Sequence, residues 1–539
     1  MKNKLFAALT AICLFVMQTV TFAQAPDLGT AANFVLFSTN GEVSNTGISQ
    51  LTGNVGSNNG SSIHFGNVNG VMHDNDGVSA QCAADLLIAY NQLNNTIATF
   101  FPDPLLGNGG ILVPGVYSIS AEASLNLELI LDAQGDPNAV FIFQIDGAFS
   151  TGPNSKVTLI NEAKACNVFW KVEGLVSMAS GTCMKGTIIA NNSAIEMNTG
   201  DTLEGRAFST AGAISVDGVL AYTPIGCGSP ILNGPAAVNL GTTACFAMYS
   251  ASGAVTNSGV TTVTGDVATN VGLTTGFNAL DVTGSIHPIP DASTIVCGVD
   301  LVSAYTYLNE LPYDIELLYP AQFGNNLVLT PHTYILKAAT IFTDTLYLNA
   351  LGNVNAVFVI QINGALSTST YSKVILINGT QAKNVFWKVD GATEINDYSI
   401  FNGTLICNNG AISVNSGVTV HGRLLTTTGN LAVSAINIIA PEIPGNCTTV
   451  EETSLGESIA DNTIIIYPNP FHSEITINTN SVQGDSEIII VNTLGEVVYQ
   501  SIITTQLTKI KTEKLTTGIY YYKIIENGRT IQSGKLISK

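Results

Sequence analysis

The chain has 539 residues, a formal net charge of −20 and only 11% charged residues. Its length allows three domains with sizeable cores, and the shortage of lysine and arginine argues against nucleic acid as a partner. No stretch beyond the N-terminus has eighteen continuous apolar residues, so we expect no transmembrane segment in the mature protein. Many glycines, threonines, asparagines and serines are typical of a β-rich extracellular protein.

Residues 1–23 are predicted to be a secretory signal peptide. Lys2 and Lys4 form the charged start, an apolar run follows from Leu5 to Val20, and Ala23 ends a small-residue cleavage site. Export permits disulfides. Loss of Cys13 with the signal peptide leaves eight of the nine cysteines.

The chain between the signal peptide and about residue 440 is a duplication. Residues 167–174 (NVFWKVEG) recur as residues 384–391 (NVFWKVDG), an offset of 217 (387 − 170) between the only two tryptophans. The same offset relates residues 139–145 to 356–362 and Gly205-Arg206 to Gly422-Arg423. A repeat of about 200 residues indicates two copies of one domain. We expect these domains at residues 27–225 and 238–440.

Short β-strands with glycine corners dominate each copy, for example at residues 156–160, 168–172 and 186–190. Regular corners between short apolar-alternating strands predict a mainly β fold of the solenoid type. One helix interrupts each copy. In the first copy it is expected to begin at Asp85 and end before Pro102, with one apolar face of Leu86, Leu87, Ala89, Tyr90, Leu93 and Ile97. In the second copy it runs from Asp300 to Pro312.

A polar linker is expected at residues 441–464, and a different domain follows it. Strands at residues 465–539 alternate apolar and polar residues, and lysines become common. This pattern predicts a separate small β-sandwich.

Several ordered motifs carry a family resemblance. Leu28-Gly29-Thr30-Ala31 opens the first copy, and residues 131–141 (LDAQGDPNAVF), 165–170 (ACNVFW) and 186–190 (GTIIA) follow in order. Both copies resemble the bacterial and fungal ice-binding proteins of the discontinuous β-solenoid type. The resemblance implies a right-handed solenoid of triangular section with a helix alongside, and ice binding through one flat face.

The tail resembles the type A sorting domain of the type IX secretion system of Bacteroidetes. The motifs are residues 467–471 (YPNPF), 494–498 (LGEVV) and 515–520 (LTTGIY). This resemblance implies recognition by the secretion machinery and export across the outer membrane. The passenger is then released or attached to the cell surface.

The residues expected to meet ice lie at solenoid corners. The family's surface motif is Thr, Ala or Gly, any residue, then Thr or Asn, and coils stacked about 4.7–4.9 Å apart would align it in columns. Threonine is suited to ordering water because its χ1 is stiff. The candidates are Thr46, Ser49, Thr151, Asn154, Ser180, Thr199 and Thr202 in the first copy, with Ser416 and Thr419 in the second. Corner threonines that cap turns or form internal ladders are the open alternative.

The second copy departs from this motif. In the first copy, Cys183 stands where the motif expects Thr or Asn and weakens the match at that corner. Asp397, Tyr398 and Ile400 interrupt the columns of the second copy. The motifs therefore predict ice binding mainly by the first domain. The competing hypothesis is a cell-surface adhesin or structural solenoid that binds glycan or protein.

We find no constellation that predicts an enzyme, a metal site or a cofactor. The histidines are scattered, and His73 and His287 occupy equivalent positions before the helices, where a structural role is favoured. Residues 73–77 (HDNDG) lack the glutamate of a calcium loop and are interpreted as a turn.

Disulfide partners can only be suggested from position. We expect Cys82 with Cys227 and Cys297 with Cys447, and less strongly Cys166 with Cys183, which leaves Cys245 and Cys407. The sequence does not fix this connectivity.

Overall fold

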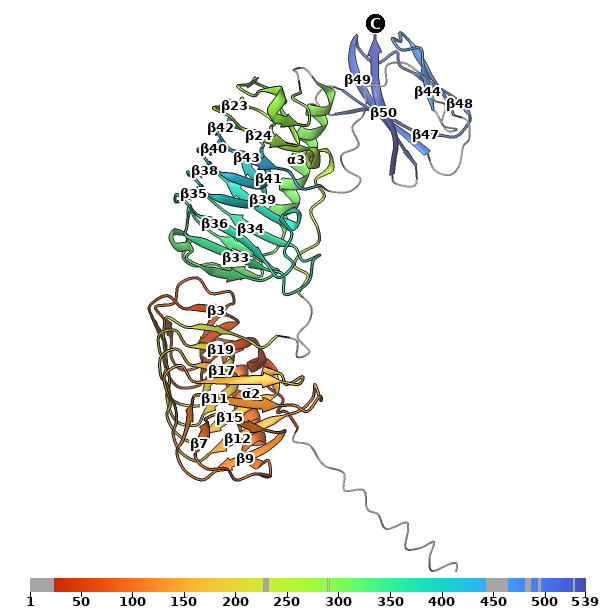
Figure 1. Ribbon diagram of the computed structural model, residues 1–539. Coiled ribbons are helices and arrows are strands. Elements are labelled where there is room, and N and C mark those ends of the chain that lie inside the picture. The colour runs from red at the N-terminus through yellow and green to blue at the C-terminus, as the bar shows by residue number, and fades with distance from the viewer. Residues whose placement is uncertain are drawn as a thin grey trace, which may run out of the picture. The chain divides into compact units, whose positions relative to one another are not determined.

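The computed structural model describes residues 24–225, 232–287, 289, 291–442, 464–479, 486–492, 496–526 and 529–539 (Figure 1). The expected signal peptide, most of the linker, Cys227 and Cys447 lie outside these residues. The chain divides into two compact units, Met1–Thr448 and Thr449–Lys539. The first unit contains both copies of the repeated domain, called solenoid 1 and solenoid 2 below.

Solenoid 1 is built from short parallel strands that stack coil upon coil and form three faces. Face 1 is an eight-stranded sheet of β7 (Leu105–Gly107), β10 (Ala123–Asn126), β13 (Phe149–Thr151), β16 (Val176–Met178), β18 (Ile195–Met197), β20 (Ile214–Asp217), β2 (Val43–Thr46) and β5 (Ser62–Ile63). Face 2 contains β8 (Gly110–Leu112), β11 (Glu128–Asp132), β14 (Lys156–Ile160), β17 (Cys183–Ala190), β19 (Thr202–Ser209), β21 (Leu220–Tyr222) and β3 (Gln50–Thr52). Face 3 contains β9 (Gly115–Ile119), β12 (Phe141–Ile145), β15 (Val168–Val172), the second halves of β17 and β19, β1 (Phe34–Ser38), β4 (Asn54–Ser57) and β6 (Met72–Asp74).

The coils of solenoid 1 do not stack in chain order. The N-terminal strand β1 pairs with β19, and β2 pairs with β20, although about 170 residues separate the partners. The first coils therefore extend the end of the solenoid that the chain reaches last. This arrangement is the discontinuous solenoid that the family resemblance implied.

Helix α2 (Gly77–Asn95) packs along face 3 of solenoid 1. Its buried side chains include Cys82, Leu86, Ala89 and Leu93. The expected start at Asp85 is wrong, because Asp76, nine residues earlier, caps the helix through a capping box with Ser79. Asp85 instead accepts the N–H of Thr30 at 2.7 Å and holds the short helix η1 (Gly29–Asn33).

The repeated motifs are core and close-packing positions. Trp170 is buried, with its ring 4.0 Å from that of Phe143, and its indole donates to the Lys185 carbonyl at 2.9 Å. Gly205 is required because a Cβ there would lie 1.9 Å from the carbonyl oxygen of Gly186 in the next coil. Buried Arg206 donates to the Ala32 carbonyl at the end of η1. Burial lowers the pKa of this guanidinium to about 10.

Solenoid 2 repeats the same architecture. Its face 1 contains β29 (Phe323–Gly324), β32 (Thr340–Thr343), β35 (Leu366–Thr368), β38 (Thr393–Ile395), β40 (Ile412–Val414), β42 (Leu431–Ser434), β23 (Val255–Ser258) and β26 (Thr274–Thr275). Its face 2 contains β30 (Leu327–Leu329), β33 (Thr345–Asn349), β36 (Lys373–Ile377), β39 (Ile400–Asn408), β41 (Thr419–Thr426), β43 (Asn437–Ile439), β24 (Thr262–Thr264) and β27 (Val282–Thr283). Its face 3 contains β28 (Ile315–Glu316), β31 (Thr333–Leu336), β34 (Phe358–Ile362), β37 (Val385–Asp390), β22 (Phe246–Ser250) and β25 (Asp266–Thr269).

Helix α3 (Ala292–Glu310) covers face 3 of solenoid 2 and is capped by Asp291, so here too the helix starts before the expected aspartate. Each of the two long helices has 19 residues. No helix among the described residues is both long and apolar enough to cross a membrane. The remaining short helices are η2 (Ala165–Asn167), η3 (Gly241–Cys245), η4 (Ala279–Asp281), η5 (Pro320–Gln322) and η6 (Ala382–Asn384).

The C-terminal unit consists of two antiparallel sheets around one apolar core, which confirms the expected small β-fold. One sheet contains β44 (Ile465–Tyr467), β45 (Glu474–Asn478) and β48 (Leu507–Lys511), and the other contains β47 (Val497–Ile503), β46 (Ser486–Val491), β49 (Gly518–Glu526) and β50 (Arg529–Ser538).

Candidate functional site

The corner between faces 1 and 2 of solenoid 1 has a left-handed residue in each coil. Asn154, Gly181 and Gly200 occupy this position with φ of 57°, 79° and 82°. Backbone hydrogen bonds place them in register, since Asn154 N donates to Ser180 O and Gly181 N donates to Thr199 O. The left-handed turn therefore favours the glycines of Ser180-Gly181 and Thr199-Gly200, and Asn154 takes the same conformation in its coil.

Three of the predicted residues, Ser180, Thr199 and Thr202, lie together at this corner, with Cys183 beside them. Exposed Ser180 precedes Gly181 as Thr199 precedes Gly200, and Cys183 lies directly opposite half-buried Thr202. Thr46 is also exposed, but it lies opposite Asp217. Asp217 accepts a 2.6 Å hydrogen bond from the Thr199 hydroxyl.

Thr151 points into the solenoid and is not available to a surface ligand. Its side chain is 8% exposed, and its hydroxyl lies 2.7 Å from that of buried Thr182. It also accepts the N–H of Ala179 at 2.9 Å. The internal-ladder alternative is therefore correct at this position. Ser49 is half-buried and donates to Asn45 at 2.6 Å.

A buried carboxylate supports the same corner from inside. Asp201 is 0% exposed and accepts the N–H groups of Thr182 and Asn198 at 2.8 and 2.7 Å. Burial raises the pKa of this carboxyl to about 6, because removal from water disfavours the charged form more than the N–H donors stabilise it.

The corresponding corner of solenoid 2 presents larger side chains. Ser416 and Thr419 are half-buried, and the Ser416 hydroxyl lies 3.2 Å from that of Ser434. Thr419 lies opposite Ile400 and Asn437, so its column is interrupted as the sequence indicated. Tyr371 and Tyr398 occupy the left-handed position in the two preceding coils.

Face 1 carries regular columns of small side chains that the corner motifs did not identify. In solenoid 1 the strands alternate buried and outward residues, and one outward residue per coil forms the middle column of Leu105, Ser124, Ser150, Ser177, Glu196, Ser215, Ser44 and Ile63. Period-two alternation in these short strands was the signal that could have found them. The flanking outward positions include the acidic residues Glu42, Glu122 and Asp217.

Face 1 of solenoid 2 is more uniform and has fewer charges. Its middle column is Ile341, Ser367, Glu394, Ser413, Ala432, Thr256 and Thr275. A flanking column consists of Ala339, Ala365, Ala392, Ala411, Asn430, Ala254 and exposed Leu273. Glu394 is the one carboxylate in these two columns, whereas the two equivalent columns of solenoid 1 hold three, Glu42, Glu122 and Glu196, and Asp217 adds a fourth in the opposite flanking column.

The other two faces of solenoid 1 are poorer candidates for contact with a flat, uncharged surface. Face 3 is covered by α2. Face 2 carries ion pairs of Lys156 with Glu128 at 3.0 Å and of Lys185 with Glu204 at 2.8 Å. Charged side chains hold their own hydration shells, which disfavours face 2 and, through its four carboxylates, also face 1 of solenoid 1. Face 1 of solenoid 2, with Glu394 as the one carboxylate in the two columns described, is therefore the better candidate contact surface.

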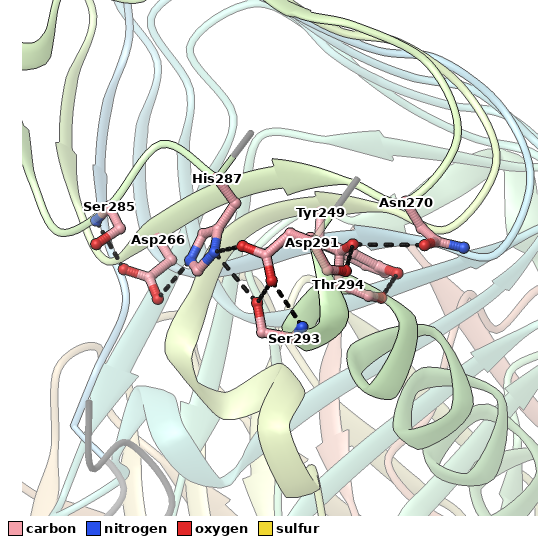
Figure 2. A network of polar contacts seen from close by, with 8 residues as sticks. All are labelled: Tyr249, Asp266, Asn270, Ser285, His287, Asp291, Ser293 and Thr294. Atoms are coloured by element: carbon pink, nitrogen blue, oxygen red, sulfur yellow. Dashed lines mark hydrogen bonds and ion pairs between the residues drawn. The ribbon is translucent and has the colours of Figure 1, made fainter. Parts of the chain in front are cut away.

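The two equivalent histidines connect the first coils to the helix caps, as the structural interpretation predicted. His287 lies between two carboxylates, 3.2 Å from Asp266 and 2.8 Å from the cap residue Asp291 (Figure 2). These hydrogen bonds, first that to Asp266, raise the pKa of His287. His73 Nδ1 lies 2.7 Å from Asp76, the cap of α2. Neither contact forms a metal site, and the described residues hold no group of three or more potential ligands.

The suggested cysteine pairs are wrong wherever the structure describes a member. Cys82, Cys183, Cys297 and Cys407 are free thiols, which removes all four pairs. Cys82 and Cys297 are buried against apolar helix-packing residues, where a thiol serves as a small apolar side chain. Burial raises the pKa of both thiols. Cys166 does form a disulfide, but not with Cys183.

Parallel coils that stack out of chain order, with a helix along one of three faces, define a discontinuous β-solenoid. The family model described as ice-binding-like matches residues 37–220 and 249–439, so the chain belongs to this family. A model of the secretion system C-terminal sorting domain matches residues 465–539. The resemblances inferred from the sequence are confirmed, and the sorting domain marks the protein for export by this secretion system.

Individual relatives agree with this assignment. The solved structure of an ice-binding protein from an Antarctic bacterium of the Flavobacteriaceae is 58% identical, covers 78% of this chain and 99% of its own, and gives a TM-score of 0.77. An ice-binding protein of Nostoc sp. (strain HG1) is 38% identical over 40% of this chain and 81% of its own length. One of Colwellia sp. is 33% identical over 37% and 83%, respectively.

Proposed function

We propose that the protein is a secreted or surface-attached ice-binding protein that adsorbs to ice through face 1 of its solenoids. The observation that carries this proposal is the set of columns of serine, threonine and alanine on face 1 of solenoid 2, with Glu394 as the one carboxylate in the two columns traced. Membership of the ice-binding-like family supports it. The role is one of surface adsorption and requires no catalytic group or cofactor.

The physical basis is regular spacing on a rigid frame. Coils in register repeat at about 4.7–4.9 Å, and small side chains keep the face even. The backbone ladders fix these side chains before binding, so little entropy is lost when water is ordered over them. A carboxylate such as Glu394 disfavours contact locally, because stripping its hydration is costly.

The corner motifs and the charge on face 1 predict different orders for the contributions of the two solenoids to ice binding. The corner motifs favour solenoid 1, whose Ser180 and Thr199 lie exposed in neighbouring coils. The charge on face 1 favours solenoid 2, because four carboxylates on face 1 of solenoid 1 interrupt its columns. We propose that face 1 carries the contact, and hence that solenoid 2 contributes at least as much as solenoid 1.

Single bulky substitutions in the full chain test this proposal. Ser413→Tyr in the middle column of solenoid 2 should weaken recrystallisation inhibition more than Ser177→Tyr in solenoid 1. Thr199→Tyr at the corner tests the motif-based ranking. Ile375→Tyr is the matched control, because Ile375 lies on face 2 beside Tyr347. An activity unchanged by both face 1 substitutions but lost in Thr199→Tyr would move the site to the corner.

We further propose that residues 465–539 act only as a sorting signal for secretion and take no part in ice contact. The match of this region to a sorting domain, with its own core around Ile475, Ile488 and Ile524, supports the proposal. The secretion machinery is the implied partner.

A further inference from the structure

The corner between faces 1 and 2 of solenoid 2 carries a pair of exposed aromatic side chains. Tyr371 and Tyr398 are 63% and 54% exposed, and their rings are stacked with centroids 5.1 Å apart and planes 14° from parallel. They lie in neighbouring coils, because Tyr371 N donates to Asp397 O. Neither phenol oxygen has a hydrogen-bond partner among the residues that the structure describes.

The backbone at both tyrosines is in a conformation that tyrosine disfavours. Their φ angles are 62° and 58°, in the left-handed region, where the equivalent corner of solenoid 1 has Asn154 and Gly181. A bulky residue in this region is a genuine outlier, and such outliers gather at functional sites. Stacking of the two rings offsets part of the cost, but glycine would remove it altogether.

The stack has one closed side and one open side. Tyr398 lies over Gly417, since a Cβ on that glycine would be 2.5 Å from Tyr398 Cδ1. Tyr371 lies on the other side of Tyr398, next to the coil that holds exposed Asp344 at the equivalent left-handed position. Among the residues that the structure describes, the one aromatic ring contact of Tyr371 is its stack on Tyr398, and 63% of its surface is exposed. Asp344 and Lys373 in the adjacent and same coils, and Asp397 in the coil of Tyr398, supply polar groups nearby.

We propose that this tyrosine pair is a binding site for a neutral polysaccharide. A flat aromatic face flanked by carboxylate and ammonium groups suits a pyranose ring, whose C–H face packs on the ring while its hydroxyls reach the polar groups. The formal net charge of −20 disfavours acidic glycans. The site is separate from face 1 and does not depend on ice binding. It would attach an exported protein to an extracellular glycan matrix.

The test is native affinity electrophoresis of the full chain in gels containing hydroxyethyl cellulose, laminarin, galactomannan or dextran. We expect retardation by at least one of these polysaccharides. The double variant Tyr371→Gly/Tyr398→Gly should lose it, with at least a tenfold weaker apparent dissociation constant. Tyr371→Phe should retain most of the retardation. Tyr313→Ala, which removes another exposed tyrosine of solenoid 2, is the matched control and should behave as wild type.

Thermal unfolding separates a binding role from a structural one. Glycine relieves the left-handed strain, so the double variant should unfold at the same temperature as the wild type or higher. The proposal is overturned if none of the four polysaccharides retards the wild type or if the double variant is retarded equally. It is also overturned if the double variant unfolds at a clearly lower temperature, because the pair would then be a structural stack.

Discussion

The buried carboxylate of Asp201 makes the stability of solenoid 1 depend on pH in an unusual direction. Its pKa is raised to about 6 in the folded protein, against 3.8 for the ordinary carboxyl. Between these two values the folded chain binds more protons than the unfolded chain, so the unfolding free energy rises as the pH falls. This stabilisation is absent above the folded pKa and grows as the pH drops toward 3.8.

Two neutral replacements isolate the contribution of Asp201 from that of every other titrating group. Asp201→Asn keeps the shape of the side chain, and Asp201→Val copies Val418, the residue 217 positions later in solenoid 2. The free energy of unfolding of the wild type, relative to either variant, should increase by about 2 kcal/mol between pH 7.5 and pH 4.5.

Urea denaturation of a fragment of residues 24–225 measures this difference, because Trp170 is its only tryptophan and lies in the core. Both variants should give the same trend with pH, whatever their absolute stabilities. A difference that stays flat would refute the reasoning. A difference that falls on acidification would show that the N–H groups of Thr182 and Asn198 stabilise the charged form more than burial disfavours it.

Three further predictions concern the core, the cap network and the tail. Because hydrogen bonds raise the pKa of His287, its contribution to the free energy of unfolding is fully present below pH 6.5 and is lost as the pH rises through the folded pKa. His287→Asn should abolish this loss of stability in urea titrations of residues 232–442, and a pH dependence of stability equal to that of the wild type would contradict the prediction. Trp387→Ala should cost about 3–5 kcal/mol of unfolding free energy, because it empties a buried site and leaves the Asn402 carbonyl without its donor; a cost below about 1 kcal/mol would show that the core refills the space. Deletion of residues 465–539 should leave the protein in the periplasm, seen by cell fractionation, while the purified solenoids inhibit recrystallisation as before; normal surface delivery would refute the sorting role.

The duplication made most of the fold predictable. Motifs at a fixed offset of 217 had to occupy equivalent places, and the structure shows them as core, close-packing and helix-anchoring residues such as Trp170, Gly205 and Arg206. The helix start was missed because the first turn of α2 is held by Asp76 and Ser79 and not by an apolar face. Periodicity reports only the part of a helix that is packed.

The candidate site was harder to predict because the residue types of a motif do not show which side chains of a strand point inward. Thr151-Gly152-Pro153-Asn154 matches the surface motif, yet Phe149 and Thr151 lie on the inward side of the same strand. The alternation of β13 would have shown that Thr151 points inward. The predicted disulfide pairs were wrong for another reason. A buried thiol such as that of Cys82 can serve as an apolar side chain without a disulfide partner.

Direct adsorption to ice tests the central claim. A fluorescently labelled chain of residues 24–442 should be taken up into a growing ice hemisphere and should coat defined planes of the crystal. The double variant Ser177→Tyr/Ser413→Tyr, with one bulky residue on face 1 of each solenoid, should be excluded from the ice although it remains folded by circular dichroism. Exclusion of the wild type, or undiminished uptake of this double variant, would contradict ice binding through face 1.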